Sequence, residues 1–428
     1  MLLVMILLLV GLMALSVPVA VAIGLSGLVG VLAFTNLPLI VLPQQAFIAL
    51  DKFPLAAVPF FILAGNLMAA GGISKRLVDL VESVIGNRRG GLPATCIVVC
   101  MIFAAVSGSS VATTYAIGAI LIPAMVAQRY PVGFAASLQA TAAELGVIIP
   151  PSIPMILYGV AASAPVGDIF VAGIGPGILI AAALMVFVLV WSRFFFNPGG
   201  DVQSKVMPPF LTSLRRSVFA LLMPVVILGG IYGGVFTPTE ASIVAVFYAL
   251  GVSMFIYREL SFVSLIDVLK RSALSSSIIM FIISMAGLFS FILTRAGIPA
   301  AISQWIVDSF DSAFMFLLVV NVLLFLVGMF VETSASIVVI APILAPVALQ
   351  FGIDPVHFGL IMITNLALGM ITPPFGVNLF AAAAVADISL HRMMRYLVPL
   401  VGVILFCLAL ITYFPMISLG SLYLFGIR

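Results

Sequence analysis

The sequence predicts an all-α polytopic membrane protein made of two inverted repeats, each with one re-entrant hairpin and one discontinuous helix. The chain of 428 residues is 64% hydrophobic and only 7% charged, whereas soluble domains carry about 25% charged residues. Apolar runs of about 17 to 25 residues follow one another along it, the length that crosses a hydrocarbon core of about 30 Å. The runs are continuous rather than alternating with period two, which favours helices over a β-barrel.

The first segment, residues 1–52, is expected to hold short apolar helices. Residues 2–35 are almost all apolar, which is too long for one comfortable span at a rise of about 1.5 Å per residue. Pro18 near the middle favours two short spans, with one long tilted helix as the alternative. The N-terminus has no basic stretch before its apolar run, so we expect no cleaved signal peptide.

Residues 53–192 are expected to form the first repeat. It begins with an apolar span at 54–70. An amphipathic segment at 74–89 follows, which carries four basic and two acidic residues. This pattern indicates a helix that lies along the membrane surface.

The rest of the first repeat contains two interruptions. Residues 92–128 are apolar except at 107–113, where five of seven residues are glycine or hydroxylated. Two half-length helices with a polar tip fit this pattern better than one span. Residues 132–163 are expected to form a helix broken at 149–152, where Pro150 and Pro151 follow each other. A span at 169–191 completes the repeat.

The middle of the chain is expected to connect the halves. Residues 193–216 are the longest polar stretch and are predicted to be a cytoplasmic linker. Two further spans within 217–272 meet at Thr237-Pro238-Thr239-Glu240. That tetrapeptide predicts a helix start with Thr as N-cap, Pro at the first helical position and Glu closing a capping box. A second polar connection is expected at 258–271.

The second half is expected to repeat this order over residues 273–396, before a final C-terminal helix at 397–428. Its predicted elements correspond one by one to those of the first half: a span at 273–293, a surface segment at 298–311, a broken apolar region at 314–350 centred on 332–336, and a helix at 356–388 broken at 372–376.

A constant offset of 223 residues relates the two halves. It superimposes Pro123 on Pro346, Gly146 on Gly369, Pro150-Pro151 on Pro373-Pro374, Ser109-Ser110 on Glu332-Thr333, and Thr113 on Ser336. Prolines at an unchanged spacing in unrelated hydrophobic helices are improbable by chance. The sequence therefore predicts an internal repeat.

Charge predicts that the two halves are inverted. The first surface segment and the linker, with Lys205, are basic, whereas the second surface segment contains Asp308 and Asp311. Cytoplasmic connections favour Lys and Arg, so the first surface segment is expected inside and the second outside. The spans can be counted consistently only if each broken apolar region is a re-entrant hairpin.

Inverted repeats with discontinuous helices are typical of secondary transporters. Non-helical backbone cannot face lipid, so it must be buried in protein or line a hydrated cavity. The proline pairs free upstream carbonyls, and these oxygens with Ser and Thr hydroxyls suit a hard monovalent cation. Helix N-termini beyond the tips offer N–H groups to an anionic substrate. One constellation can thus hold both sodium and a carboxylate.

Structural roles remain the alternative for several of these residues. Ser, Gly and Thr in membrane helices commonly serve close packing, but here they cluster at a tip, recur at a fixed offset and lie near a double proline. Intramembrane carboxylates are costly unless functional or paired. Glu332 is left open between a site role and packing support, and Glu144 is expected to hydrogen-bond a neighbouring helix. Cys96, Cys100 and Cys407 are interpreted as buried small residues.

Five stretches give the chain a close resemblance to the large membrane subunit of TRAP transporters, the tripartite ATP-independent periplasmic systems. The resemblance runs over nearly the whole length and rests on Pro59-Phe60-Phe61-Ile62-Leu63-Ala64-Gly65, the tip at 107–113, the break at 146–154, the turn at 236–240, and Gly369-Met370-Ile371-Thr372-Pro373-Pro374-Phe375-Gly376-Val377-Asn378.

The resemblance implies a permease of the bacterial inner membrane that imports an organic acid, such as a C4-dicarboxylate or sialic acid, with sodium as coupling ion. It implies an elevator movement of a transport domain, bearing both hairpins, against scaffold helices within 1–52 and 217–272. It also implies a small four-helix membrane subunit, expected here as a separate chain, and a periplasmic substrate-binding protein. No cofactor besides sodium and no nucleic acid is expected.

By the same resemblance, one sodium is expected at Ser107, Gly108, Ser109, Gly146, Val147 and Pro150, and a second at Thr333, Gly369, Met370 and Thr372. Neighbouring residues are the candidates for substrate contact: Ser110, Thr113, Pro151, Ser152, Glu332, Ser334, Ser336, Pro374, Gly376 and Asn378.

Three other functions are the alternatives. A stand-alone sodium/dicarboxylate elevator carrier would need no binding protein. An intramembrane hydrolase, and hence an enzyme, is disfavoured because the Asp residues fall at span edges and no HExxH motif is present. A passive channel is disfavoured because the tips would plug a continuous pore.

Overall fold

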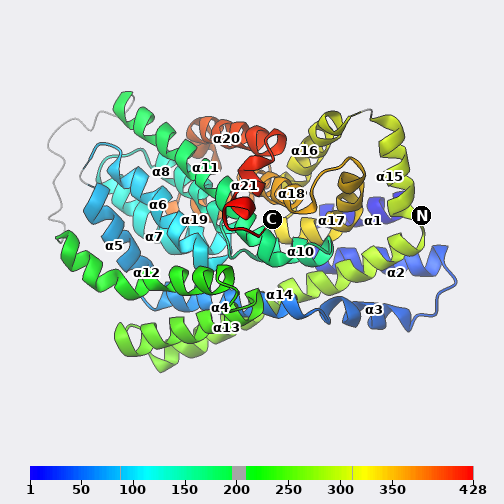
Figure 1. Cartoon of the computed structure of the whole chain (residues 1–428), viewed down its shortest axis with the longest axis horizontal. Coiled ribbons are helices and arrows are strands. Elements are labelled where there is room, and N and C mark those ends of the chain that lie inside the picture. Colours follow the sequence, from blue (N-terminus) through cyan, green and yellow to red (C-terminus); the bar gives the residue numbers. More distant parts are fainter. Residues whose placement is uncertain (87, 195–208, 311, 428) are drawn as a thin grey trace.

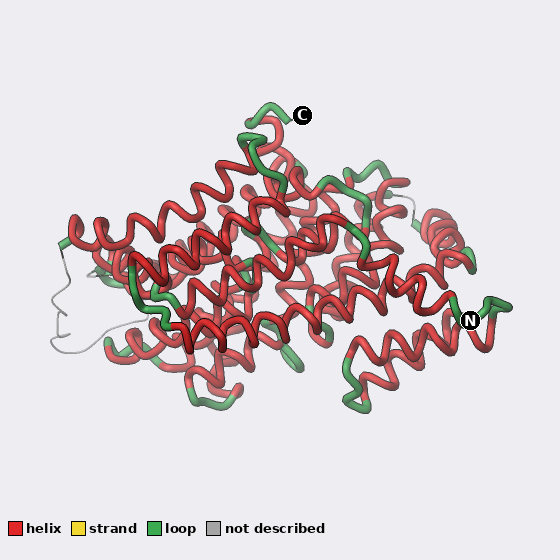
Figure 2. The backbone as a smooth tube through the Cα atoms, turned by 90° about the horizontal axis from the view of Figure 1, so that it is seen from below, coloured by secondary structure: helices red, strands yellow, loops and turns green. Residues whose placement is uncertain are grey.

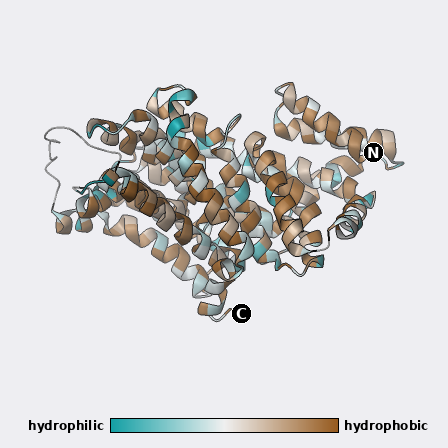
Figure 3. Ribbon diagram, turned by 90° about the horizontal axis from the view of Figure 1, so that it is seen from above, coloured by the Kyte–Doolittle hydropathy of each residue, from teal (hydrophilic) through white to brown (hydrophobic). Residues whose placement is uncertain are grey.

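The computed structural model describes residues 1–86, 88–194, 209–310 and 312–427, and helices make up nearly all of this part (Figure 2). By length and composition, nine described helices could cross a membrane, or up to ten if one bent pair counts as a span. Apolar residues predominate on the helices (Figure 3). The predicted all-α polytopic membrane fold is confirmed.

The N-terminal segment forms three helices: α1 (Leu2–Ala14), α2 (Val19–Phe34) and α3 (Val41–Leu50). The preference for two short helices over one long one is therefore confirmed. Ser26 Oγ donates to the Met5 carbonyl at 2.6 Å and ties α2 to α1. Helix α3 was not predicted, because Pro43, Gln44 and Gln45 interrupt its apolar pattern.

The first repeat contains the predicted elements in order: η1 (Phe53–Ala56), α4 (Ala57–Ala70), α5 (Ile73–Ile85), α6 (Gly91–Ser107), α7 (Ser110–Ala127), α8 (Val132–Ala143), α9 (Leu145–Ile148), α10 (Ile153–Ala161) and α11 (Val166–Phe194). The amphipathic helix α5 buries its apolar side, with Leu77 and Val78, and packs on α6. The interruption at Gly108 and Ser109 is where the sequence indicated it. Helices α6 and α7 have 17 and 18 residues, so they are longer than the half-length helices expected. Their re-entrant course stays a prediction.

The middle of the chain differs from the prediction at its boundaries. It comprises α12 (Phe210–Tyr232), α13 (Pro238–Gly251), the π-helix η2 (Val252–Ile256) and α14 (Phe262–Arg295). Residues 210–216 and 262–271, expected in polar connections, are helical because Lys and Arg are good helix formers that extend a helix beyond its apolar part. The capping box of Thr237 and Glu240 is confirmed, with both reciprocal hydrogen bonds present. Linker residues 195–208, with Lys205, and Asp311 lie outside the described residues.

The second repeat and the C-terminal segment follow as α15 (Ile298–Ser309), α16 (Ala313–Phe330), α17 (Thr333–Gln350), α18 (Pro355–Met370), α19 (Val377–Ala386), α20 (Leu390–Tyr413) and α21 (Met416–Leu424). Helices α7 and α17 begin 223 residues apart, as do α8 and α18. The Pro150-Pro151 and Pro373-Pro374 peptide bonds, at the same offset, are both cis. The repeat is thus present in the structure, while its inversion stays a prediction.

Each broken helix sends its second part across to the other repeat. Helix α10 packs against α17 and α18, whereas α19 packs against α7 and α8. Figure 1 shows α19 in orange among the cyan helices of the first repeat. The Tyr158 hydroxyl of α10 donates to the Pro355 carbonyl at the start of α18 at 2.7 Å. The two repeats are therefore interlocked where their helices break.

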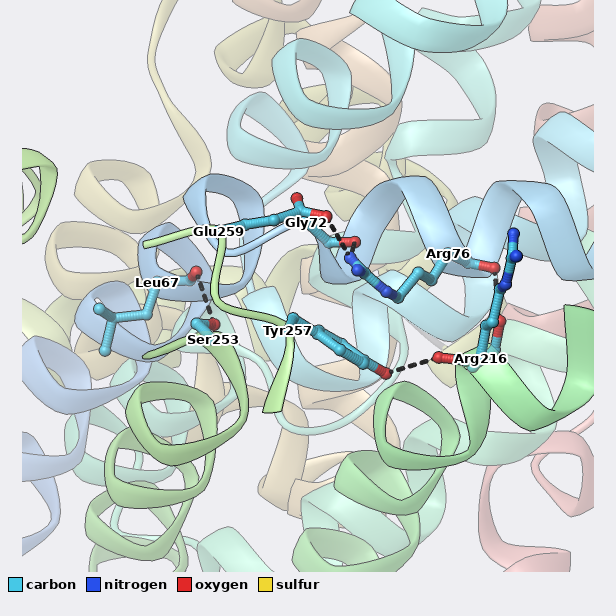
Figure 4. A network of polar contacts seen from close by, with 8 residues as sticks. Leu67, Gly72, Arg76, Arg216, Ser253, Tyr257 and Glu259 are labelled. Carbon is cyan, nitrogen blue, oxygen red and sulfur yellow. Dashed lines mark hydrogen bonds and ion pairs between the residues drawn. The ribbon is translucent and has the colours of Figure 1, made fainter. Parts of the chain in front are cut away.

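The guanidinium of Arg76 joins α5 to the segment after η2, and Tyr257 of that segment contacts α12 (Figure 4). Its Nη1 lies 2.7 Å from the Glu259 carboxylate, and its Cζ lies 3.7 Å from the centre of the Tyr257 ring. Nη1 also donates to the Gly72 carbonyl at 2.9 Å, and the Tyr257 hydroxyl donates to the Arg216 carbonyl at 3.0 Å. Because the positive charge is stabilised by both a carboxylate and an aromatic face, this cluster fixes the start of α5.

We expect Arg76→Ala to lower the free energy of unfolding by about 1–2 kcal/mol, since a partly exposed ion pair and a cation–π contact each contribute up to about 1 kcal/mol. Arg76→Lys keeps the charge but loses planar stacking, so it should recover only part of the loss. Denaturant unfolding of the purified protein in detergent measures both. Equal stability of the Ala variant and the native chain would contradict the role of this cluster.

Candidate functional site

The tip between α6 and α7 touches the break between α9 and α10. Gly108 is left-handed, with φ 60°, and its carbonyl accepts a hydrogen bond from the Ile153 N–H at 3.3 Å. A β-carbon placed on Gly146 would lie 2.9 Å from the Ser109 carbonyl oxygen and 3.0 Å from the Thr113 hydroxyl. The structure therefore brings together residues of the tip and the break that the sequence assigned to one cluster.

Hydroxyls and carbonyls face one another in this first cluster. Ser107 Oγ lies 3.0 Å from Thr113 Oγ1 and 3.5 Å from the Ser109 carbonyl oxygen. Thr113 Oγ1 also donates to that carbonyl at 2.8 Å. Ser152 Oγ donates to the Val147 carbonyl at 2.6 Å and caps the N-terminus of α10. The cluster is an arrangement of neutral oxygens, nearly all of them buried.

The proline pairs alter the hydrogen bonding of carbonyls in both breaks, where the Val147 carbonyl accepts from the Ser152 hydroxyl and the Gly369 carbonyl from the Thr372 N–H. A helical carbonyl accepts from the N–H four residues later, and proline has no N–H. Prolines stand four residues after two carbonyls in each break: Pro150 and Pro151 after Gly146 and Val147, and Pro373 and Pro374 after Gly369 and Met370. These carbonyls therefore lose their ordinary helical donors.

The second tip touches the second break through different side chains. The Thr333 hydroxyl lies 2.9 Å from the Met370 sulfur. Gly328, near the end of α16, packs closely on the last turn of α18: a β-carbon on it would lie 3.2 Å from the Gly369 Cα. The Thr372 hydroxyl donates to a carbonyl one turn earlier at 2.8 Å. The structure thus places the four residues expected at the second sodium in one region.

The two breaks differ in exposure. Pro150, Pro151 and Ser152 are buried, whereas Pro374 is exposed and Phe375 is 57% exposed. The first cluster is therefore closed over by protein, and the second break reaches the molecular surface.

The Glu332 carboxylate is the N-cap of α17. One oxygen accepts from the N–H groups of Ser334 and Ala335 at 2.9 and 3.1 Å, and the other accepts from the Ser334 hydroxyl at 2.8 Å. A carboxylate at a helix N-terminus is stabilised by these donors and by the helix dipole. Of the two readings left open for Glu332, the geometry favours support of the tip.

Nearly all the candidates for substrate contact gather at four helix N-termini. Ser110 and Thr113 lie in the first turn of α7; Pro151 and Ser152 immediately precede α10; Glu332, Ser334 and Ser336 lie at the start of α17; Pro374, Gly376 and Asn378 lie at the start of α19. Ser336 also lies in the first turn of α17, but its surroundings differ from those of the other candidates. It lines an almost wholly apolar cavity of about 540 Å³ between α1, α2 and α14 to α17.

Asn378 joins the two repeats directly. It is fully buried, its Nδ2 donates to Glu144 Oε1 at 2.6 Å, and its Oδ1 accepts from the Thr114 hydroxyl at 2.9 Å. The predicted hydrogen bond of Glu144 to a neighbouring helix is therefore confirmed, with α19 as that helix. Thr114 was missed by the sequence reasoning, although it follows the tip immediately.

A crevice of about 310 Å³ is lined by residues of α3, α10, α14 and α17. Lys52 is the one charged residue among those described that line it, and its Nζ lies 3.5 Å from the Val160 carbonyl oxygen. Lys52 is not among the site residues predicted from the sequence. One sequence feature could have indicated its role: Lys52 is the first basic residue of the chain and lies between two apolar segments.

We expect Gly146→Ala to destabilise the protein by about 1–3 kcal/mol, because the added methyl would press on the Ser109 backbone in a packed interior. Gly402→Ala in α20 is the matched control, since nothing lies within 4 Å of its β-carbon position; it should stabilise slightly, by about 0.5–1 kcal/mol. Thermal unfolding in detergent compares the two. Equal effects of the two substitutions would contradict the contact between tip and break.

Comparison with known proteins identifies the family. Residues 6–417 match the family described as tripartite ATP-independent periplasmic transporter, DctM component. The chain is 42% identical over 399 residues to the C4-dicarboxylate TRAP transporter large permease protein DctM of Pseudomonas aeruginosa, covering 93% of each chain. It is also 42% identical over 406 residues to the isethionate TRAP transporter permease protein DctMQ of Oleidesulfovibrio alaskensis. That match covers 94% of this chain but only 64% of the relative, less than two thirds of its length.

The fold has a counterpart among solved structures. The YdaH transporter of Alcanivorax borkumensis is similar with a TM-score of 0.64 and 15% identity, covering 97% of this chain and 99% of that one. At this identity the likeness concerns the fold alone, and it is to a membrane transporter. The near-complete family match, together with the interlocked repeats and the nine candidate spans among the described residues, leads to one conclusion. The chain belongs to the DctM family of TRAP transporter large permeases, multi-pass proteins of the bacterial inner membrane.

Proposed function

We propose that this chain is the permease subunit of a sodium-coupled, binding-protein-dependent transporter that imports an organic acid by an elevator movement. The observation that carries the proposal is the pair of tip-and-break clusters at a constant offset in a chain of this family. As a transporter component, the chain is not proposed to catalyse a chemical reaction.

The donor chemistry of the first cluster fits sodium. Hard monovalent cations prefer neutral oxygens, and Ser107, Ser109, Gly146 and Val147 offer hydroxyl and carbonyl oxygens without a formal charge. Among the described residues, no group of three or more His, Cys, Asp or Glu side chains could hold a metal. The second cluster would use the carbonyls of Gly369 and Met370 with the hydroxyls of the facing tip.

The substrate would be an organic anion at the helix N-termini between the clusters. N–H groups at the starts of α7, α10 and α19 favour negative charge, whereas Glu332 already caps the start of α17. Two similar relatives are named for C4-dicarboxylate and for isethionate, both organic anions. We extend this class to the present chain as a C4-dicarboxylate, sialic acid or similar acid.

In the proposed elevator movement, the body that contains both breaks would move relative to α3 and α14 along this crevice. Residues 273–293 of α14, expected in the second repeat, would then belong to the scaffold side. Helices α2 and α3 pack along the 34-residue helix α14, which suits them to a fixed scaffold. The interlocked breaks suit a body that moves as one. Lys52 at the crevice would attract the incoming anion.

The proposed partners are a small four-helix membrane subunit and a periplasmic binding protein, in keeping with the tripartite description of the family. Purified chain, small subunit and binding protein are reconstituted in proteoliposomes, and uptake of labelled acids is measured. We expect uptake only with an inward sodium gradient and all three components. Uptake without sodium would contradict the coupling, and uptake by this chain alone would favour a stand-alone carrier instead.

Ser107→Ala and Thr372→Ala each remove one hydroxyl from a proposed sodium site. We expect each to raise the sodium concentration for half-maximal uptake about tenfold, the effect of losing about 1.4 kcal/mol of binding. Ser277→Ala is the control, because its exposed hydroxyl bonds only its own helix. The prediction fails if both site variants keep the sodium dependence of the control.

Lys52→Gln removes the charge in the crevice and preserves most of the side-chain volume. It is expected to raise the substrate KM several-fold at low ionic strength, with little change in maximal rate, because an exposed charge acts mainly on encounter. The difference should shrink as salt is raised with choline chloride at constant sodium. An unchanged KM at low salt would remove Lys52 from the substrate path.

A further inference from the structure

Helix α19 begins directly after the second break, yet it packs on the first repeat. Its second residue is Asn378, whose amide is fully buried and uses both its oxygen and its nitrogen. The nitrogen donates to Glu144 at 2.6 Å, and the oxygen accepts from Thr114 at 2.9 Å. Glu144, Thr114 and Asn378 are all buried, so water does not compete for these hydrogen bonds. This three-residue link connects α19 to α7 and to the end of α8.

Both partners of Asn378 lie beside the first cluster. The Glu144 carbonyl accepts from the Val147 N–H at 3.1 Å and so closes the turn that presents Gly146 and Val147. Thr114 directly follows Thr113, whose hydroxyl contacts Ser107 in the tip. A displacement of Asn378 would therefore act on both halves of the first cluster.

On its own helix, Asn378 lies beside the second cluster. Gly376 stands two residues before it, and a β-carbon on Gly376 would lie 2.8 Å from the Met370 carbonyl oxygen and 3.0 Å from the Thr372 nitrogen. The start of α19 is thus packed against the backbone expected to hold the second sodium. An ion that orders this backbone would also fix the position of Asn378.

The link has no symmetric copy. The offset of 223 residues places Met155 at the position of Asn378 in the first repeat, and a methionine side chain cannot make these two hydrogen bonds. The contact between Tyr158 and the Pro355 carbonyl also joins the repeats, but neither residue belongs to either cluster. Asn378 is therefore specialised in a way that the repeat does not require.

We propose that Asn378 is a positioning residue that couples the two sodium sites through Glu144 and Thr114. Sodium at the second break holds α19 in place, and the fixed amide holds the first cluster in its binding geometry. Because coupling between sites is reciprocal, sodium at the first cluster favours binding at the second to the same extent. This inference rests on the proposed sodium coupling. It adds the hydrogen-bonded link that makes sodium binding at the two sites cooperative.

The test is the sodium dependence of uptake by the reconstituted three-component complex. The native complex should give a Hill coefficient near 2, the number of proposed sites, and Asn378→Leu should lower it toward about 1, because sites without coupling fill independently. Leucine is close to asparagine in size and makes neither hydrogen bond. Tyr158→Phe is the matched control: it removes a different hydrogen bond between the repeats and should leave the coefficient unchanged.

Thr114→Val is the second variant, and it decides the question if Asn378→Leu fails to assemble. It removes one of the two hydrogen bonds with almost no change in shape, so it should lower the coefficient in the same direction. A merely structural role would reduce the amount of active complex and leave the coefficient of the remainder unchanged. Cooperative uptake that survives in Asn378→Leu or, failing its assembly, in Thr114→Val would overturn the inference and leave the sodium coupling standing. Uptake by the native complex that does not depend on sodium would overturn both this inference and the proposed sodium coupling.

Discussion

The structure depends on one constraint: a proline pair interrupts a buried helix once in each repeat. Pro150-Pro151 and Pro373-Pro374 deprive upstream carbonyls of their helical donors, and such backbone cannot be left facing lipid. Each break must therefore be buried in protein or line a hydrated cavity. The tip at Gly108 packs on the buried first break, whereas the tip at 332–336 packs on a second break that stays partly exposed at Pro374. Polar tips that pack on polar backbone create the two oxygen-rich clusters.

The interlocking of the repeats follows from the same breaks. After each proline pair the chain changes direction, so α10 packs on the second repeat and α19 on the first. Neither repeat could move far without the other. The clusters therefore lie within one body, and under the proposed elevator movement the crevice beside α3 and α14 would be its boundary. This division suits a carrier that moves its binding sites as a unit.

Much of this could be predicted from the sequence, because it depends on residues with strong local effects. Proline pairs, the polar tip at Ser107 and the capping box at Thr237 located breaks and helix starts correctly. The amphipathic pattern located α5. Helix α3 was missed because Pro43 and two glutamines mask its apolar face, and the helices that begin at Phe210 and Phe262 extend through basic residues that had suggested loops. The bonds of Asn378 to Glu144 and Thr114 join residues more than 230 positions apart, and only the folded chain shows such a pairing.

The two clusters are proposed to bind sodium. The most direct measurement is a structure of the complex with its small subunit, determined in sodium and again with choline in its place. Cation density is expected among the oxygens of Ser107, Gly146 and Val147, and again between Thr333 and Thr372, in sodium only. Clusters that look identical in both conditions, with no density among these oxygens, would contradict it.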